Sequence, residues 1–277
     1  MTFRSQPPTP MSPAPMSPGL ELLYPDWSVS QRVRACTTTR GGGTSTGAYA
    51  GLNLATHVGD DPARVAANRQ LLAAALGLPS DPVWLEQVHG IEVLEIGETT
   101  EGVEAIGGEQ AIPCADSSLT HRLDRVCAVL TADCLPLLLC ERQGRAVAAV
   151  HAGWRGLLAG VIEQTVARLA ESPEKIAAWL GPAIGQDAFE VGPEVRAAFV
   201  AADAQATLAF KPSPGARWLA DLYTLARQRL RQTGVNDISG GHHCTFTDQE
   251  RFYSYRRDGR TGRMATLIWL DSTISAT

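Results

Sequence analysis

Three side chains that can bind a metal ion or act as nucleophiles stand where short apolar segments end. His89 follows the segment 82–88 and precedes Gly90, and His151 ends the apolar run 146–150. Cys134 ends the first β-type run of the apolar segment 125–141. Functional groups are often displayed on loops at the edge of a rigid sheet, so these three residues are candidates for one site.

Two kinds of chemistry suit these residue types. Three nitrogen and sulfur ligands without a strong fourth match an open catalytic zinc site, in which the metal activates a water molecule. Alternatively, His151 lowers the pKa of the Cys134 thiol and makes it a nucleophile. In a purely structural interpretation, Cys134 packs as a small apolar residue and each histidine caps a turn. The spacing alone leaves all three open.

Two arginine-containing segments suggest a site for a small anion. The motif "HAGWRG" (151–156) predicts a helix start whose free N–H groups, together with Arg155, favour phosphate or carboxylate. Arg256 and Arg257 in "FYSYRRDG" (252–259) are candidates to line a pocket for a flat ring and an anion. In both segments, solvated surface arginines are the alternative.

Composition narrows the class of protein. The 277 residues are 44% hydrophobic and 19% charged, as in ordinary globular proteins, and the net charge of −5 argues against a nucleic-acid partner. No apolar run reaches the roughly 18 residues of a membrane span. The six cysteines form no C-x-x-C pair, which argues against a zinc ribbon or a disulfide framework and favours the reducing cytoplasm.

The pattern of elements predicts a single domain. Residues 1–19 are rich in Pro and Ser and are expected to form a disordered tail, which leaves 20–277 as the folded catalytic domain. Strands are predicted at 33–40, within 125–141, 145–153 and 175–185, and on both sides of a turn at 89–90 within 82–96. Helices are predicted at 60–77, 156–172, 193–203 and 219–233, with short strands and turns from 240 to 270.

A series of motifs resembles one known family over about residues 24–270. They are "CTTTRGGGTSTGAYAGLNLATHVGDDPARVAANR", "WLEQVHG", "ADSSLTH", "LTADCLPLLL", "HAGWRGLLAGVI", "WLGPAIG", "FEVGPEV" and "CTFTDQERFYSYRRDGRTGRMA". Together they look like the YfiH or laccase-domain family, also called the polyphenol-oxidase-like or peptidoglycan-editing-factor family.

The resemblance implies a fold and a metal. The fold is a compact α+β domain with mixed β-sheets sandwiched by helices, an αββα-like arrangement shared with the catalytic domain of deamidating toxins. The family's zinc ligands fall on His89 in "QVHG", Cys134 in "TADC" and His151 in "HAGWRG". These residues and Asp133, a proton carrier or turn cap, are the candidate catalytic residues.

The resemblance also implies chemistry on small molecules. Family members phosphorolyse adenosine, inosine and methylthioadenosine and deaminate adenosine, and some bacterial members are credited with removing wrongly built peptidoglycan precursors. Phosphorolysis needs an anion site, for which Arg40 and Arg155 are candidates. Asn53 and His57 are expected to contact the ligand, with loop hydrogen bonding as their alternative role.

Other functions remain to be weighed. Multicopper chemistry requires many histidines in H-x-H pairs, and this chain has six histidines and no such pair, so it is rejected. A single copper in place of zinc, a Cys-His hydrolase or amidase, and a non-catalytic binding domain remain as alternatives. The three retained ligands argue against the last of these. The sequence does not indicate an oligomeric state.

Overall fold

Two β-sheets lie face to face in the computed structural model, which describes residues 19–97, 112–170 and 172–275. The four-stranded sheet is antiparallel and has the order β1-β2-β13-β5. Its strands are β1 (Leu22–Leu23), β2 (Val33–Thr38), β13 (Met264–Leu270) and β5 (Cys127–Thr131). The tail predicted at 1–19 lies, apart from Gly19, outside the described residues.

The second sheet has six strands in the order β12-β8-β6-β7-β4-β3. They are β12 (Asp237–Gly240), β8 (Ile176–Leu180), β6 (Leu135–Glu141), β7 (Val147–Ala152), β4 (Ser117–Thr120) and β3 (Val93–Glu95). The sheet is mixed, because β12 pairs with β8 and β3 with β4 in parallel while the other pairs are antiparallel.

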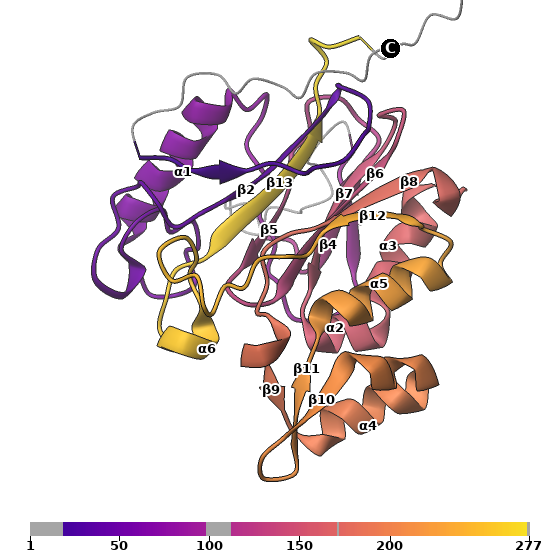
Figure 1. The fold of residues 1–277 in the computed structure, drawn as a ribbon. Coiled ribbons are helices and arrows are strands. Elements are labelled where there is room, and N and C mark those ends of the chain that lie inside the picture. The colour runs from indigo at the N-terminus through magenta and orange to yellow at the C-terminus, as the bar shows by residue number, and fades with distance from the viewer. Residues whose placement is uncertain (1–18, 98–111, 171, 276–277) are drawn as a thin grey trace, which may run out of the picture.

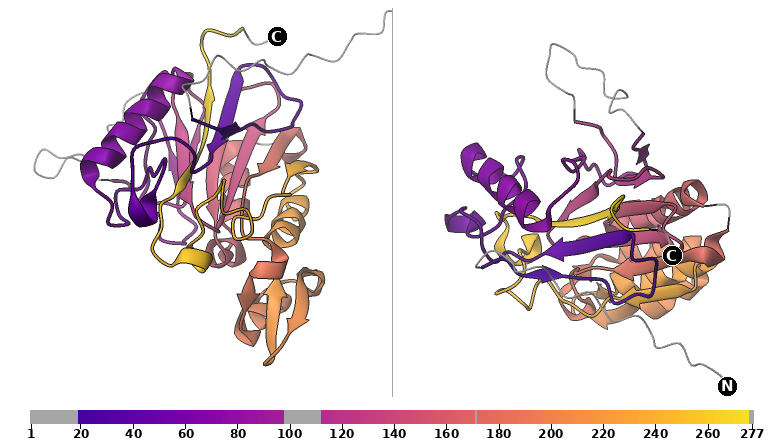
Figure 2. Two further views of the ribbon diagram at one scale, coloured as in Figure 1. Left: turned by 60° about the vertical axis from the view of Figure 1, so that its left-hand side comes forward. Right: turned by 90° about the horizontal axis from the view of Figure 1, so that it is seen from above.

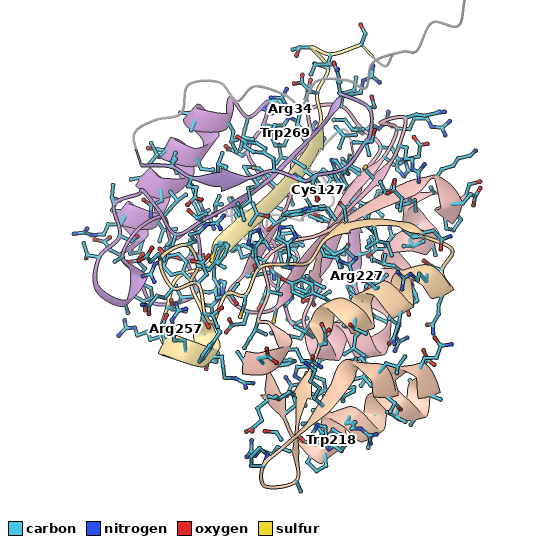
Figure 3. The ribbon with its side chains drawn as sticks, viewed as in Figure 1. Arg34, Cys127, Trp218, Arg227, Arg257 and Trp269 are labelled. Carbon is cyan, nitrogen blue, oxygen red and sulfur yellow. The ribbon has the colours of Figure 1, made fainter. Side chains whose placement is uncertain are left out.

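Both faces of the six-stranded sheet are buried, which explains why β6 and β7 are apolar except for Glu141 and His151. In β6, Leu137 and Leu139 belong to the core under the helices, whereas Leu138 and Cys140 pack between the two sheets. Cys127 of β5 faces the same inter-sheet core (Figure 3). Successive residues of a strand point to opposite faces, so the sequence fills two cores at once.

Helices cover the outer face of each sheet and complete an αββα sandwich, as expected. Helix α1 (Pro62–Leu76) packs on the four-stranded sheet, and α3 (Val161–Leu169) and α5 (Leu222–Gln232) pack on the six-stranded sheet (Figures 1 and 2). The predicted ends of α1 are confirmed: Asp61 accepts a hydrogen bond from the amide of Ala63, and Gly77 adopts the left-handed conformation.

Several predicted elements differ from the structure. The helix expected at 156–172 is divided into α2 (Trp154–Ala159) and α3 by Gly160, whose φ of 104° breaks the helix. The first strand expected in 82–96 makes only isolated bridges at Val83 and Glu86. In the C-terminal segment, a short helix α6 (Tyr255–Asp258) precedes β13 where short strands were expected.

A third sheet was not predicted at all. It has the order β10-β11-β9 and consists of β9 (Glu190–Val191), β10 (Phe210–Ser213) and β11 (Arg217–Ala220). With α4 (Pro193–Ala202) it forms a small unit beside the sandwich (Figure 1). Four 3-10 helices, η1 (Gly47–Tyr49), η2 (Pro173–Lys175), η3 (Gln186–Ala188) and η4 (Ala204–Ala209), lie in connections. No helix among the described residues has the length and apolar character to cross a membrane.

Candidate metal centre

Cys134 and His151 meet at one end of the neighbouring central strands β6 and β7, because these two strands are antiparallel. Cys134 directly precedes β6, and His151 is the penultimate residue of β7. In the register of the two strands, Pro136 lies opposite His151 and Leu135 opposite Ala152. His89, in the connection that precedes β3, lies at the same end of these strands.

The position of His89 depends on the carboxylate of Asp116. The amides of Val88, His89 and Gly90 donate hydrogen bonds to this carboxylate at 3.1, 2.9 and 2.6 Å. His89 itself has a φ of 61°, a left-handed conformation that non-glycine residues rarely adopt. Because three successive N–H groups converge on one buried anion, the turn holds this conformation.

Asp116 also orients His151. Its Oδ1 lies 2.7 Å from Nδ1 of His151, and its backbone carbonyl accepts the amide of His151 at 2.7 Å. A histidine that donates one ring nitrogen to a carboxylate presents the other nitrogen as a ligand. Burial would raise the pKa of Asp116, but its hydrogen bonds to His151 and the loop lower it, so it remains an anion.

The donor atoms of His89, Cys134 and His151 all lie within 4.8 Å of one another. Sγ of Cys134 is 3.8 Å from Nε2 of His89, and the two imidazole rings meet edge to face with centroids 4.8 Å apart. Ligands of a tetrahedral zinc ion are about 3.4–3.6 Å apart, so the donor set fits such an ion after a small contraction. Within the described parts of the chain no fourth His, Cys, Asp or Glu joins the group. His89 is exposed, so the group faces solvent.

Gly153 leaves the space that this cluster occupies. A Cβ atom at Gly153 would lie 2.9 Å from Cδ2 of His89 and 3.0 Å from Sγ of Cys134. The backbone of Gly153 has a φ of −63°, which any residue can adopt, so the requirement for glycine is one of space. A Cβ at Gly156 would meet the carbonyl oxygen of Gly90 at 2.8 Å, so α2 packs closely on the His89 turn.

The electrostatics of the cluster favour a thiolate. Burial would raise the pKa of the Cys134 thiol, but the charge and hydrogen bond of His151 and the neighbouring His89 lower it to about 6. Burial would lower the pKa of His151, but Cys134 and Asp116 raise it to about 9. In metal-free protein these interactions favour the thiolate of Cys134 and the imidazolium of His151. A thiolate suits both metal binding and nucleophilic attack.

Comparison with known proteins places the chain in a family. A sequence model described as multi-copper polyphenol oxidoreductase laccase matches residues 34–271. The chain belongs to this family. The family suggested by the sequence motifs is thus confirmed, and so is its α+β fold.

Similar proteins match about nine tenths of this chain. Purine nucleoside phosphorylase YfiH of Escherichia coli is 54% identical over 90% of this chain and 99% of its own length. Purine nucleoside phosphorylase PA4543 of Pseudomonas aeruginosa is 51% identical over 90% and 98%. The crystal structure of NMB0706 from Neisseria meningitidis has a TM-score of 0.84 at 47% identity, covering 91% of this chain and 99% of that one.

Asp133, which lies between β5 and Cys134, forms a structural link. Its carboxylate accepts hydrogen bonds from Oγ1 of Thr245 and from the amide of Arg256, both at 2.6 Å. Its φ of 93° is strained for a non-glycine residue. The residue therefore fastens the segment 245–256 beside Cys134, and its role as a proton carrier stays a prediction.

The two arginines expected to bind an anion have other contacts. The guanidinium of Arg40 donates to the carbonyls of Gln249 and Ala50 at 3.2 and 3.4 Å and lies 4.7 Å from the ring centre of Tyr253. Arg155 is exposed on α2 and stacks on Trp154 at 4.4 Å. Of these two arginines, only Arg155 lies in the same sequence motif as a candidate ligand, His151.

Asn53 and His57 occupy the loop that faces the C-terminal segment. Asn53 is fully buried, and its side chain bonds to the backbone of Ala55 and Arg263 and to Asp60. It therefore braces the loop, the alternative role considered for it. His57 is exposed, and burial followed by the charges of Arg263 and Arg69 lowers its pKa.

The aromatic pocket proposed around "FYSYRRDG" is instead a small core. Phe252 and Tyr253 are fully buried, and the guanidinium of Arg257 donates to the carbonyls of Thr245, Phe246 and Phe252. Tyr255, the third aromatic residue of this segment, is 61% exposed. This part of the chain shapes the wall beside Cys134 and contains Arg263, which sequence reasoning did not single out.

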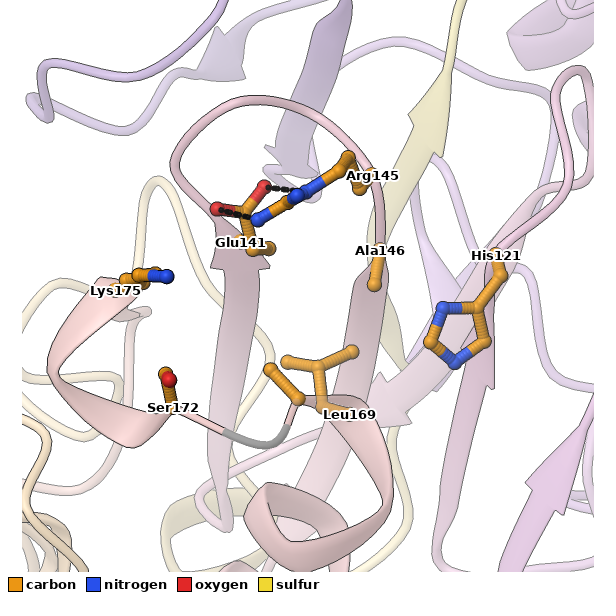
Figure 4. Close-up of a pocket in the computed structure, with 8 residues that line it drawn as sticks. His121, Glu141, Arg145, Ala146, Leu169, Ser172 and Lys175 are labelled. Atoms are coloured by element: carbon orange, nitrogen blue, oxygen red, sulfur yellow. Dashed lines mark hydrogen bonds and ion pairs between the residues drawn. The ribbon is translucent and has the colours of Figure 1, made fainter.

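A cavity of about 380 Å³ opens at the end of β6 and β7 that lies away from Cys134 and His151 (Figure 4). His121 and Lys175 line it together with the Glu141–Arg145 ion pair. Glu141 is the last residue of β6, whereas Cys134 precedes its first residue. This cavity and the candidate metal centre therefore lie at opposite ends of the strand.

Proposed function

We propose that the protein is a zinc-dependent purine nucleoside enzyme of the cytoplasm. It phosphorolyses adenosine, inosine and methylthioadenosine, and it deaminates adenosine as a second activity. The observation that carries the proposal is the solvent-facing cluster of His89, Cys134 and His151, held by Asp116. The names of the Escherichia coli and Pseudomonas aeruginosa relatives support the substrate class. All six cysteines are unpaired, which suits a reducing compartment.

His89, Cys134 and His151 would hold the zinc ion, and Asp116 would keep both histidines in place. When bound, zinc supplies a Lewis acid that polarises groups of the substrate or a water molecule. The mixed nitrogen and sulfur donor set and the spacing of its atoms suit this ion.

In phosphorolysis an oxygen of phosphate bonds to C1′ of the ribose while the bond between C1′ and N9 breaks. The purine leaves with the electron pair of that bond and takes up a proton. The protein must bind phosphate, orient the nucleoside and supply the proton. We assign phosphate contacts to cationic side chains, with Arg40 and Arg155 as candidates, and a nucleoside contact to the exposed His57, whose loop the buried Asn53 braces.

In deamination water adds to C6 of adenosine and ammonia leaves, which requires proton transfers between oxygen and nitrogen. Asp133 is our candidate for carrying these protons because it adjoins Cys134 in the chain. Its carboxylate already accepts two hydrogen bonds, so one of them must yield during the transfer.

The decisive experiment incubates zinc-loaded protein with adenosine, with and without phosphate, and separates the products by chromatography. Adenine that forms only with phosphate, and inosine that forms in either case, are expected. If neither product forms, the proposal is rejected. Inosine and methylthioadenosine are tested in the same way.

A thiol hydrolase or amidase acting on peptidoglycan precursors is a second candidate. It is favoured by the order Cys134, His151, Asp116, which resembles a nucleophile, a base and an orienting carboxylate. Such an enzyme would keep its activity after removal of metal and lose it on alkylation of Cys134. A zinc content near one per chain, and activity that a chelator abolishes, would exclude it.

A polyphenol oxidase with one copper ion is a third candidate, because mixed nitrogen and sulfur sites bind copper more tightly than zinc. The donor set of the cluster and the family's description favour it. Oxidation of a phenol by copper-loaded protein in air, compared with zinc-loaded protein, tests it directly.

A further inference from the structure

Arg263 lies next to the metal centre because of the pairing between β13 and β5. Met264, the first residue of β13, lies opposite Thr131, the last residue of β5. Arg263 thus stands at the point where the chain leaves β5 toward Asp133 and Cys134. Its amide donates to Oδ1 of the buried Asn53 at 3.0 Å, which fixes its backbone.

The side chain of Arg263 is a cation without a neutralising partner. Its Nη1 donates to the carbonyls of Thr261 and Gly262, and the guanidinium lies 5.8 Å from the ring centre of Tyr255. Over residues 19–97, 112–170 and 172–275, no carboxylate lies within ion-pair distance of it, and no acceptor meets Nε or Nη2. The Nε–Nη2 edge is the one that binds oxyanions through two parallel hydrogen bonds.

Partial burial disfavours this unneutralised charge. It lowers the pKa of the Arg263 guanidinium, and the negative charges of Cys134 and Asp133 only partly offset this. Neither can approach as a partner, because Cys134 belongs to the ligand cluster and Asp133 is bound to Thr245 and Arg256. A small anion bound to the free edge would stabilise the charge.

We propose that Arg263 is the phosphate-binding residue of this active site, holding inorganic phosphate through its Nε–Nη2 edge beside the His89, Cys134 and His151 cluster. The assignment rests on the proposed phosphorolysis and identifies where its second substrate binds. An oxygen of this phosphate bonds to C1′ as the bond from C1′ to N9 breaks, and the base departs with the electron pair and a proton.

Arg263 is better suited to this role than Arg40 or Arg155. The guanidinium of Arg40 is directed to two backbone carbonyls, and Arg155 is exposed and stacked on its neighbour. Arg263 combines partial burial, a free bidentate edge and proximity to the cluster. Burial strengthens a charge-assisted hydrogen bond because water competes less for its partners.

The test compares Arg263→Gln and Arg263→Lys with Arg40→Gln, Arg155→Gln and the control Arg142→Gln. Arg142 pairs with Asp237 at the opposite end of β6. KM for phosphate, KM for adenosine and kcat are measured on zinc-loaded proteins of verified zinc content. For Arg263→Gln we expect KM for phosphate to rise about 10- to 100-fold, with KM for adenosine changed less than 3-fold, as for loss of a charged hydrogen bond. Arg263→Lys keeps the charge but loses the two parallel N–H groups of the guanidinium. Its KM for phosphate should lie between those of the wild type and Arg263→Gln.

Binding without turnover gives a second readout. Phosphate should raise the thermal midpoint of the zinc-loaded wild type and of Arg142→Gln above that in chloride of equal ionic strength, but not that of Arg263→Gln. The ratio of adenine to inosine formed from adenosine should also fall in Arg263→Gln. An unchanged KM for phosphate in this variant, or a larger effect of Arg40→Gln or Arg155→Gln, overturns the assignment while leaving phosphorolysis intact. Failure of the wild type to make adenine from adenosine and phosphate rejects both the assignment of Arg263 and the proposed phosphorolysis.

Discussion

Asp116 accepts a hydrogen bond from Nδ1 of His151 at 2.7 Å, and the same carboxylate holds the turn that carries His89. One buried anion thus positions two of the three candidate ligands. Cys134 and His151 are placed by strand pairing, whereas His89 reaches them through a loop that lacks such support. The site consequently depends on a residue that contributes no ligand atom to it.

Asp116→Asn should weaken zinc binding about 10- to 100-fold, as is usual when the partner of a ligand histidine is removed. An amide retains the shape but loses the charge, and it cannot accept from every donor that now converges on the carboxylate. Zinc affinity is measured by competition with a chromophoric chelator. Asp237→Asn, which breaks a surface pair with Arg142, is the matched control. Equal affinities in the two variants would show that Asp116 does not position the ligands.

Gly153→Ala should weaken zinc binding by more than 10-fold while the protein remains folded. The new methyl group would lie 2.9 Å from His89 and 3.0 Å from Cys134, closer than side chains approach one another. Zinc content after dialysis and the thermal midpoint are measured together. Gly90→Ala is the control, since its Cβ would meet its nearest neighbour at 3.4 Å, an ordinary contact. The steric explanation fails if both variants bind zinc like the wild type.

In metal-free protein, the rate of alkylation of Cys134 by iodoacetamide should rise with pH through a midpoint near pH 6 and then level off. The sign follows from the lowered pKa of the thiol, which makes the thiolate the main form at neutral pH. His151→Gln should move the midpoint toward higher pH, because the cation that opposes burial is lost. Modification is followed at the Cys134 peptide by mass spectrometry. A wild-type midpoint near the ordinary 9.0 would contradict the thiolate–imidazolium pair.

Asp133→Ala should lower the free energy of unfolding by about 3 kcal/mol, since it leaves the hydroxyl of Thr245 and the amide of Arg256 without their charged acceptor. The left-handed φ of residue 133 adds to this cost. Urea titration provides the measurement. Thr245→Ala removes one of the two donors and should cost about 1 kcal/mol. A loss for Asp133→Ala no greater than that for Thr245→Ala would be inconsistent with its linking role.

Sequence reasoning succeeded where local chemistry and structure coincide. The caps at Asp61 and Gly77 predicted α1, and the apolar runs predicted β5 to β8. The motifs around His89, Cys134 and His151 indicated a shared centre through family resemblance, and the structure brings these residues together. From residue types alone the same three remained ambiguous, because nothing in their spacing shows that β6 and β7 place them at one edge.

The remaining features depend on contacts between distant segments. Asp116 directly precedes β4, a sequence position that does not mark it as functional. Its contacts with Val88, His89 and His151 arise only in the folded chain. Gly160 breaks a helical pattern through a φ of 104°, which periodicity does not reveal. The strands β9 to β11 are short and half polar, so their pairing rather than their sequence defines them. Arg263 acquires its position from the register between β13 and β5.

The left-handed turn at His89 is maintained by amide hydrogen bonds to Asp116, which belong to the protein itself and do not require coordination. The conformational entropy of ordering this ligand is therefore lost when the chain folds, and an incoming ion need not supply it. A donor set ordered in this way would favour ions whose radius and preferred geometry require only a small contraction of its atoms. At the candidate metal centre, selectivity would thus depend on the carboxylate of Asp116, which supplies no ligand atom.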